Sequence, residues 1–100
     1  MKAVWDDKVI AEADEDDLIY IEGNWYFPPD SLNQQYFRES DTPYNCPWKG
    51  DTQYFDVGEG EDWSADNAWS YPDPVPSSIE KVKKDYSDYV AFWRSVQVIE

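Results

Sequence analysis

The sequence predicts a small, mainly β domain of antiparallel strands with one or two short helices. Short runs of β-branched and aromatic residues recur along the chain, separated by glycine, proline, asparagine and aspartate. Six Trp, eight Tyr and four Phe supply far more apolar surface than a disordered chain carries, although the mean hydropathy is −0.84. A chain of 100 residues can bury one core, so we expect a single domain over residues 1–100.

The N-terminal part is expected to form strands joined by tight turns. Lys2–Trp5 and Lys8–Glu12 read as two strands, and the two aspartates between them favour a turn. Residues 14–17 are all acidic and would repel one another within a sheet, so we place them at the tip of a hairpin. Residues 18–22 have the β propensity of a central strand, which a glycine-asparagine pair then ends.

The middle of the chain is expected to contain two further strands and a short helical segment. Residues 25–27 favour a strand that two prolines end. Asp30 is then the expected N-cap of one or two helical turns over residues 31–36. Residues 51–57 alternate as a strand, and the Gly-Glu-Gly sequence at residues 58–60 is expected to close it into a hairpin or bulged loop.

The C-terminal third is expected to contain the helix. Residues 68–71 favour a short extended segment, and the alternating prolines of residues 72–76 favour a polyproline-like strap over the surface. Ser77 or Ser78 is the expected cap of a helix that begins near Ile79. Two final segments have β character: residues 89–93 and 95–99.

The net charge of −14 excludes several classes of partner. Twenty-two acidic residues against eight basic ones give a field that repels polyanions. Nucleic-acid binding needs a basic patch, and the one basic cluster, over residues 81–84, is flanked by acids. We therefore expect neither a nucleic acid nor an anionic membrane as a partner, while the acidic surface leaves a protein partner open.

Cysteine and histidine usage narrows the chemistry further. One cysteine excludes an internal disulfide and a multi-cysteine zinc site, and the absence of histidine removes the commonest metal ligand. We accordingly expect no metal site and no cofactor. Neither a signal peptide nor an apolar run long enough to cross a bilayer is recognisable, so a soluble, cytoplasmic protein is expected.

Residues 45–50, with the sequence NCPWKG, stand out as a candidate site. They hold the only cysteine of the chain, Cys46, three residues before Lys49, and nearby positive charge favours a reactive thiolate. The alternative is structural, because Pro47 forces an extended conformation on Cys46 and a lone cysteine is commonly a small core residue. Regular alternation would put Cys46 and Lys49 on opposite faces, so a shared site requires a turn between them.

Four ordered blocks of the sequence are similar to a known family: residues 22–29 (EGNWYFPP), 46–50 (CPWKG) with Tyr54, 68–72 (AWSYP) and 89–93 (YVAFW). On these blocks the chain resembles the bacterial family catalogued as domain of unknown function 427, over nearly its whole length. The resemblance implies a compact β-tent-like or barrel-like domain. That fold is also used by methionine sulfoxide reductase B and by the thalidomide-binding domain of cereblon.

Some catalogues name this family a nucleotidyltransferase. Such enzymes hold Mg²⁺ on paired carboxylates, but a pair such as Asp62 with Asp66 is unsurprising in a chain with twenty-two acids. Gly58 and Gly60 begin a glycine motif, yet Trp63 stands where the dinucleotide-binding fingerprint needs glycine. Nucleotidyl transfer therefore has little support among the residues themselves.

Thiol chemistry is a second enzymatic reading that the resemblance suggests. Methionine sulfoxide reductase B uses a cysteine nucleophile, and Cys46 with Lys49 beside it would be the counterpart here. The histidines of that enzyme have no counterpart in this chain, and neither does a second cysteine that would resolve a disulfide.

The function that we expect is binding of a small molecule in a pocket near the Cys-Pro-Trp-Lys-Gly segment. Tyrosine and tryptophan give rigid apolar platforms, and a few polar side chains can orient a ligand. The alternatives are an enzyme with Cys46 or Lys49 as catalytic residue, and an acidic domain that binds proteins. The expected ligand-binding residues are Glu22, Asn24, Tyr26, Cys46, Lys49, Tyr54 and Tyr71.

Overall fold

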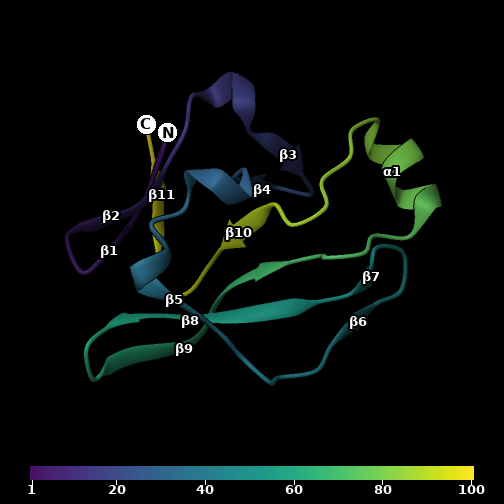
Figure 1. Cartoon of the computed structure of the whole chain (residues 1–100). Coiled ribbons are helices and arrows are strands. Elements are labelled where there is room, and N and C mark those ends of the chain that lie inside the picture. Colours follow the sequence, from purple (N-terminus) through teal and green to yellow (C-terminus); the bar gives the residue numbers. More distant parts are fainter.

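Short antiparallel strands make up most of the structure, a computed structural model that describes residues 1–100. The chain forms eleven strands, one α-helix and three 3-10 turns, and the strands belong to four antiparallel sheets (Figure 1). The prediction of a mainly β, antiparallel single domain is confirmed. No helix of the structure has the length and apolar character that crossing a membrane needs, since the one α-helix is seven residues long.

The first sheet brings the two ends of the chain together. Its strands are β1 (Lys2–Trp5), β2 (Lys8–Glu12) and β11 (Gln97–Ile99), in the order β11-β1-β2. Asp6 and Asp7 form the turn between β1 and β2 with φ values of 50° and 61°, the left-handed conformation that suits a tight hairpin. The N- and C-termini consequently lie side by side (Figure 1).

The second sheet is built on a long hairpin. Its strands are β10 (Val90–Phe92), β9 (Asp62–Ser70), β8 (Gln53–Glu59) and β5 (Phe37–Glu39), in the order β10-β9-β8-β5. The expected hairpin after β8 is confirmed. The second strand of this hairpin is longer than expected, because β9 begins at Asp62 and not near residue 68.

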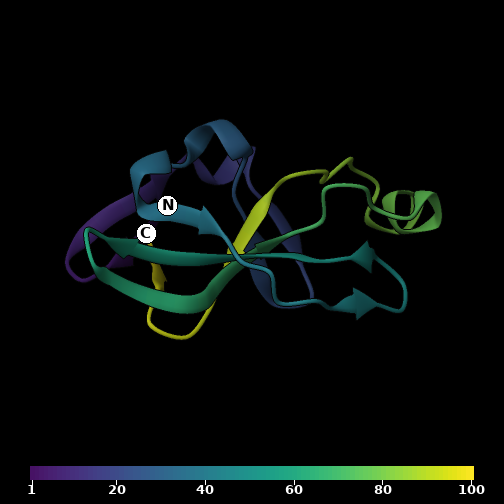
Figure 2. The same cartoon turned by 60° about the horizontal axis from the view of Figure 1, so that its bottom comes forward.

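Two small hairpins complete the strands. The first consists of β3 (Ile19–Ile21) and β4 (Asn24–Tyr26), and the second of β6 (Asn45–Cys46) and β7 (Gly50–Asp51). The expectation that residues 18–22 form a central strand is wrong, because β3 pairs only with β4. In Figures 1 and 2 the β6–β7 hairpin lies at the same end of the molecule as the helix, away from the β1–β2 turn.

The helical segments differ in detail from the sequence expectations. The acidic run forms η1 (Glu15–Asp17), which leads from the first sheet into β3 and is not a hairpin tip. Asp30 lies inside η2 (Pro29–Ser31) and caps nothing, and a second 3-10 turn, η3 (Gln34–Tyr36), follows it. The helix α1 (Pro76–Val82) begins at a proline, which fits the first helical position because its missing N–H needs no partner.

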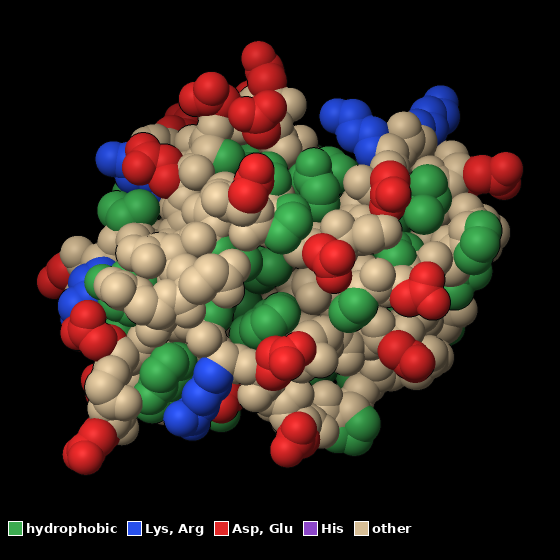
Figure 3. Space-filling view, viewed as in Figure 1, with side chains coloured by type: hydrophobic (Ala, Val, Ile, Leu, Met, Phe, Trp, Pro, Cys, Tyr) green, Lys and Arg blue, Asp and Glu red, His purple; other side chains and the backbone are tan.

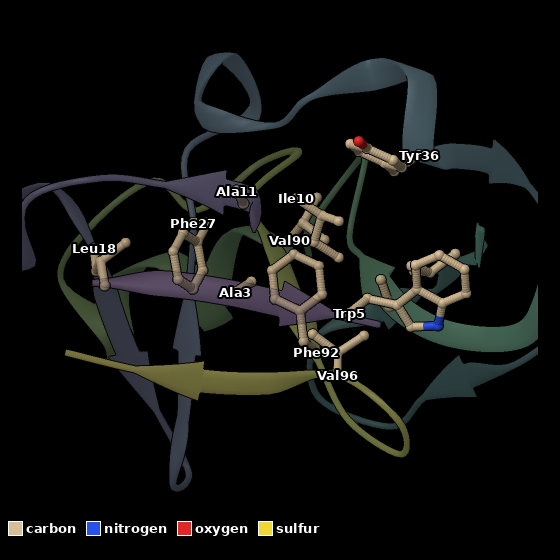
Figure 4. Close-up of a cluster of buried hydrophobic side chains, with 12 residues drawn as sticks. Ala3, Trp5, Ile10, Ala11, Leu18, Phe27, Tyr36, Val90, Phe92 and Val96 are labelled. Carbon is tan, nitrogen blue, oxygen red and sulfur yellow. The ribbon is translucent and has the colours of Figure 1, made fainter. Parts of the chain in front are cut away.

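Two buried clusters flank β10, and its alternating side chains supply both. Val90 and Phe92 enter the first cluster, and Ala91 enters the second, as the two-residue period of a strand requires. Phe27, which follows β4, pairs with Val90 through two backbone hydrogen bonds of 2.8 and 2.9 Å, so the β3–β4 hairpin is fixed to β10. Figure 4 shows the first cluster, with Phe92 near its centre and Phe27 between Leu18 and Ala3.

The second cluster is smaller and richer in tyrosine. Tyr26, Tyr71 and Tyr86 are at most 5 % exposed and pack with two isoleucines of β3, with Ala91 and with Cys46. The hydroxyls of Tyr86 and Ser78 lie 2.7 Å apart, which links α1 to this cluster. This tyrosine-rich cluster forms the support on which the candidate site is built.

Candidate functional site

A pocket of about 370 Å³ opens over the second buried cluster, and its walls are mostly aromatic. Its volume falls in the range of small-molecule sites. We call it the aromatic pocket, and it is lined by Asn24, Tyr26, Tyr44, Lys49, Tyr54, Trp69, Tyr71 and Trp93.

Strand register explains why aromatic side chains meet along one wall. Tyr54 of β8 pairs directly with Trp69 of β9, and residues paired in this way project from the same face of a sheet. Trp93 follows β10, the neighbour of β9, and its ring stacks on Tyr54 with a centroid distance of 6.3 Å and an interplanar angle of 17°. Its edge-to-face contact with Trp69, at 5.4 Å, completes a wall of three rings.

The indole N–H groups of this wall are used within the protein. Trp69 Nε1 donates to the hydroxyl of Tyr26 at 3.1 Å, and Trp93 Nε1 donates to the backbone carbonyl of Asp66. The rings are thereby fixed in orientation. The tryptophans consequently offer the pocket their apolar surfaces and no free N–H donor.

Lys49 is the only charged side chain that lines the pocket. The residue is 6 % exposed, and its ammonium donates to Glu22 Oε1, whose side chain is 56 % exposed. The ammonium also lies 4.7 Å from the ring centre of Trp48 and 5.3 Å from that of Tyr71. Carboxylate and ring faces together compensate for the lost hydration of a lysine at this depth.

The backbone around Lys49 explains its inward direction. Residues 47–49 form the turn between β6 and β7, and Gly50 follows with φ of 115°, a conformation open to glycine. A Cβ at Gly50 would lie 3.4 Å from the carbonyl oxygen of Asp73, so the proline-rich segment packs closely on this turn. Val75 N also donates to Lys49 O at 2.9 Å, which ties the turn to the start of α1.

Burial raises the pKa of Tyr26, Tyr54 and Tyr71, which line the pocket. It raises the pKa of Tyr26 to about 12, against the opposing effect of the hydrogen bond from Trp69. Burial also raises the pKa of Tyr71, with smaller contributions from Tyr26 and Cys46, and that of Tyr54. These shifts affect ionisation only in the alkaline range, and near neutral pH each hydroxyl carries its proton and can donate a hydrogen bond.

The structure brings most of the sequence-predicted residues together. Five of the seven expected ligand-binding residues line the aromatic pocket, while Glu22 contacts the pocket only through Lys49. Cys46 lies in the second buried cluster, beneath the pocket and 8 % exposed. Cys46 and Lys49 can share a site only if the chain turns between them, and such a turn is present at residues 47–49. Cys46 and Lys49 both adjoin Tyr71.

Sequence reasoning missed three lining residues: Tyr44, Trp69 and Trp93. In the sequence, Trp69 and Trp93 have the character of ordinary core residues, yet Trp93 is 40 % exposed. Tyr44, which no pattern singles out, is 51 % exposed. An available signal was the excess of aromatic residues over what a core of this size needs. That signal does not say which of the aromatic residues face solvent.

A larger hollow of about 900 Å³ lies elsewhere, and we do not assign it as the site. It is lined largely by exposed acids, among them Asp14, Asp16 and Asp17. Figure 3 shows such acidic side chains spread over one whole face, so their density there is not distinctive. No three of the acidic or cysteine side chains converge in a way that could hold a metal ion.

The fold and site together define a small antiparallel β domain with an aromatic pocket and a buried lysine at its edge. The family described as Domain of unknown function (DUF427), with the short name NTP_transf_9, matches residues 1–100. The chain therefore belongs to this family. No curated protein matches it.

Proposed function

We propose that this domain binds a small molecule in the aromatic pocket. The observation that carries the proposal is the combination of a preformed, mostly apolar hollow with a few convergent polar groups, which is typical of ligand sites. Strands from separate hairpins and sheets supply its walls, so the pocket is a product of the whole fold.

Two exposed aromatic rings at the pocket add support. Tyr44 and Trp93 are 51 % and 40 % exposed, although burial of either ring would stabilise the chain. Rings left open beside a pocket give a ligand apolar surface to cover. The hydroxyls of Tyr44 and Tyr54 make no hydrogen bond within the chain, so both are available to a ligand.

A titration tests this proposal. ATP with and without Mg²⁺, phenylalanine, glucose, choline and benzamide would each be added while tryptophan fluorescence is followed, and any binding would be confirmed by calorimetry. We expect a saturable response to at least one compound. In Trp93→Ala its affinity should fall about tenfold or more, because one stacking ring is worth about 1 to 3 kcal/mol.

The matched control is Tyr20→Ala. Tyr20 is also an exposed aromatic residue, 58 % exposed, and it packs on Trp25 outside the pocket. Its removal should leave the affinity unchanged. A response that Tyr20→Ala and Trp93→Ala weaken equally would contradict the proposal, and so would a flat response to the whole panel.

A further inference from the structure

The chemistry of the aromatic pocket also indicates the class of ligand. We infer that the pocket takes an uncharged planar ring bearing a hydrogen-bond acceptor, such as a carboxamide or a ring carbonyl, with that acceptor on Lys49 Nζ. This inference rests on the proposed function of the same pocket.

The planar ring follows from the geometry of the aromatic wall. Tyr54 and Trp93 are nearly parallel, and Trp69 stands at 71° to Trp93, so the rings present flat apolar faces in two orientations. Both indole N–H groups are already bonded within the protein. A flat ring gains contact with such faces without leaving a buried donor unpaired.

The acceptor follows from the unused donors of Lys49. An ammonium carries three N–H donors, and Lys49 Nζ has one hydrogen-bond partner, the carboxylate of Glu22. The side chain is 7 % exposed, so water has little access to the other donors. Besides Glu22, the ammonium has only the ring faces of Trp48 and Tyr71 as partners, and a ligand oxygen that reaches it would be a stronger acceptor than either ring.

The absence of net charge on the ligand follows from the Lys49–Glu22 pair. Glu22 already neutralises Lys49, and no carboxylate lines the pocket. A ligand anion would therefore add a negative charge close to Glu22, in a protein whose net charge is −14. A cation would instead lie next to the ammonium of Lys49. Glu22 thus disfavours an anionic ligand and Lys49 a cationic one, while neither residue disfavours an uncharged ligand.

Three compounds of nearly the same shape test this inference: benzamide, benzoate and benzamidine. Near neutral pH they are uncharged, anionic and cationic, respectively. Calorimetry on the intact protein should give benzamide the lowest Kd, with the two ions at least about tenfold weaker, as expected for one poorly screened like-charge contact.

A single substitution should then change the preference. In Glu22→Gln the ammonium of Lys49 has no counter-charge, so benzoate should gain about tenfold relative to benzamide. The matched control is Glu61→Gln, which removes the same charge from an exposed residue at the β8–β9 turn that forms no ion pair. Its benzoate-to-benzamide ratio should equal that of the wild type.

A second variant addresses the contact itself. Lys49→Met keeps most of the side-chain volume and removes the donors, so benzamide should bind about tenfold more weakly to this variant. The wild-type series remains decisive even if Glu22→Gln or Lys49→Met folds poorly.

The outcomes separate the ligand class from the pocket. Tightest binding of benzoate or benzamidine to the wild type would overturn the inferred class and leave the pocket as the binding site. The inferred class would also be overturned, and the pocket retained, if another compound of the panel binds while benzamide, benzoate and benzamidine do not. No binding of any compound would overturn both proposals.

Discussion

Lys49 shows how a single residue can connect the stability of this domain with its site. Its side chain is 7 % exposed, while the side chain of its partner Glu22 is 56 % exposed. Removing Glu22 and removing Lys49 should therefore have different effects on stability. A half-exposed carboxylate regains water, whereas a buried ammonium does not.

We predict that Glu22→Gln destabilises the protein more than Lys49→Met does. The first change leaves a buried ammonium without its carboxylate, at a cost of about 2 kcal/mol. The second leaves an exposed carboxylate and keeps the apolar stem, so it should cost less than about 1 kcal/mol. Urea unfolding of both variants measures the difference. Equal costs would mean that water reaches Lys49 in the folded state.

The β8–β9 hairpin is the element on which most of the aromatic wall depends. It places Tyr54 opposite Trp69, and a shift in register between Phe55 and Val57 separates this pair from the pairs next to the turn. Gly58 lies opposite Trp63 near that turn, and a Cβ there would be 2.2 Å from the carbonyl oxygen of Asp62. The close approach of the two strands therefore depends on glycine.

The two glycines of this hairpin provide a matched pair for a prediction. Gly58→Ala should cost about 3 kcal/mol, because the strands must separate to admit the methyl group. Gly60→Ala should cost about 1 kcal/mol, because Gly60 has open space around it and only a φ of 62° to strain. Chemical denaturation of both variants gives the comparison. A larger loss for Gly60→Ala would show that backbone conformation, not space, limits this hairpin.

At the scale of the whole molecule, the second buried cluster makes the free energy of unfolding fall as the pH rises in the alkaline range. Burial raises the pKa of Tyr26 to about 12 and raises those of Tyr71 and Tyr86. Unfolded tyrosine ionises near pH 10, so above that pH the unfolded chain loses protons before the folded one. The protonated Tyr26 hydroxyl therefore contributes its full stabilisation of the folded state below about pH 10, and this stabilisation is lost as the pH rises through about 12.

We therefore predict that the free energy of unfolding falls steeply between about pH 10 and pH 12. Tyr26 alone should account for about 2 kcal/mol of that fall, since one pKa unit corresponds to about 1.4 kcal/mol. In Tyr26→Phe the fall should be smaller by this amount, after a loss of about 1 kcal/mol at neutral pH for the hydrogen bond from Trp69. Urea unfolding across this pH range is the measurement. An unchanged slope in the variant would show that Tyr26 ionises normally in the folded protein.

The sequence by itself determined several local elements and the residue types from which the site is built. Alternation and turn residues correctly predicted β1, β2 and the hairpin after β8, because these features depend on neighbours along the chain. The NCPWKG segment also identified Lys49, since a lone lysine between an aromatic residue and glycine is unusual in so acidic a chain.

Only the tertiary structure decided which strands pair and which aromatic residues remain open. The acidic run after β2 reads as a hairpin tip, yet the chain passes there into another sheet, because β2 pairs with β1 and β3 pairs with β4. Trp69 and Trp93 likewise look like core residues in sequence, and nothing local marks Tyr44 as part of a site. Their positions in the pocket depend on contacts between residues distant in the chain, which no local pattern specifies.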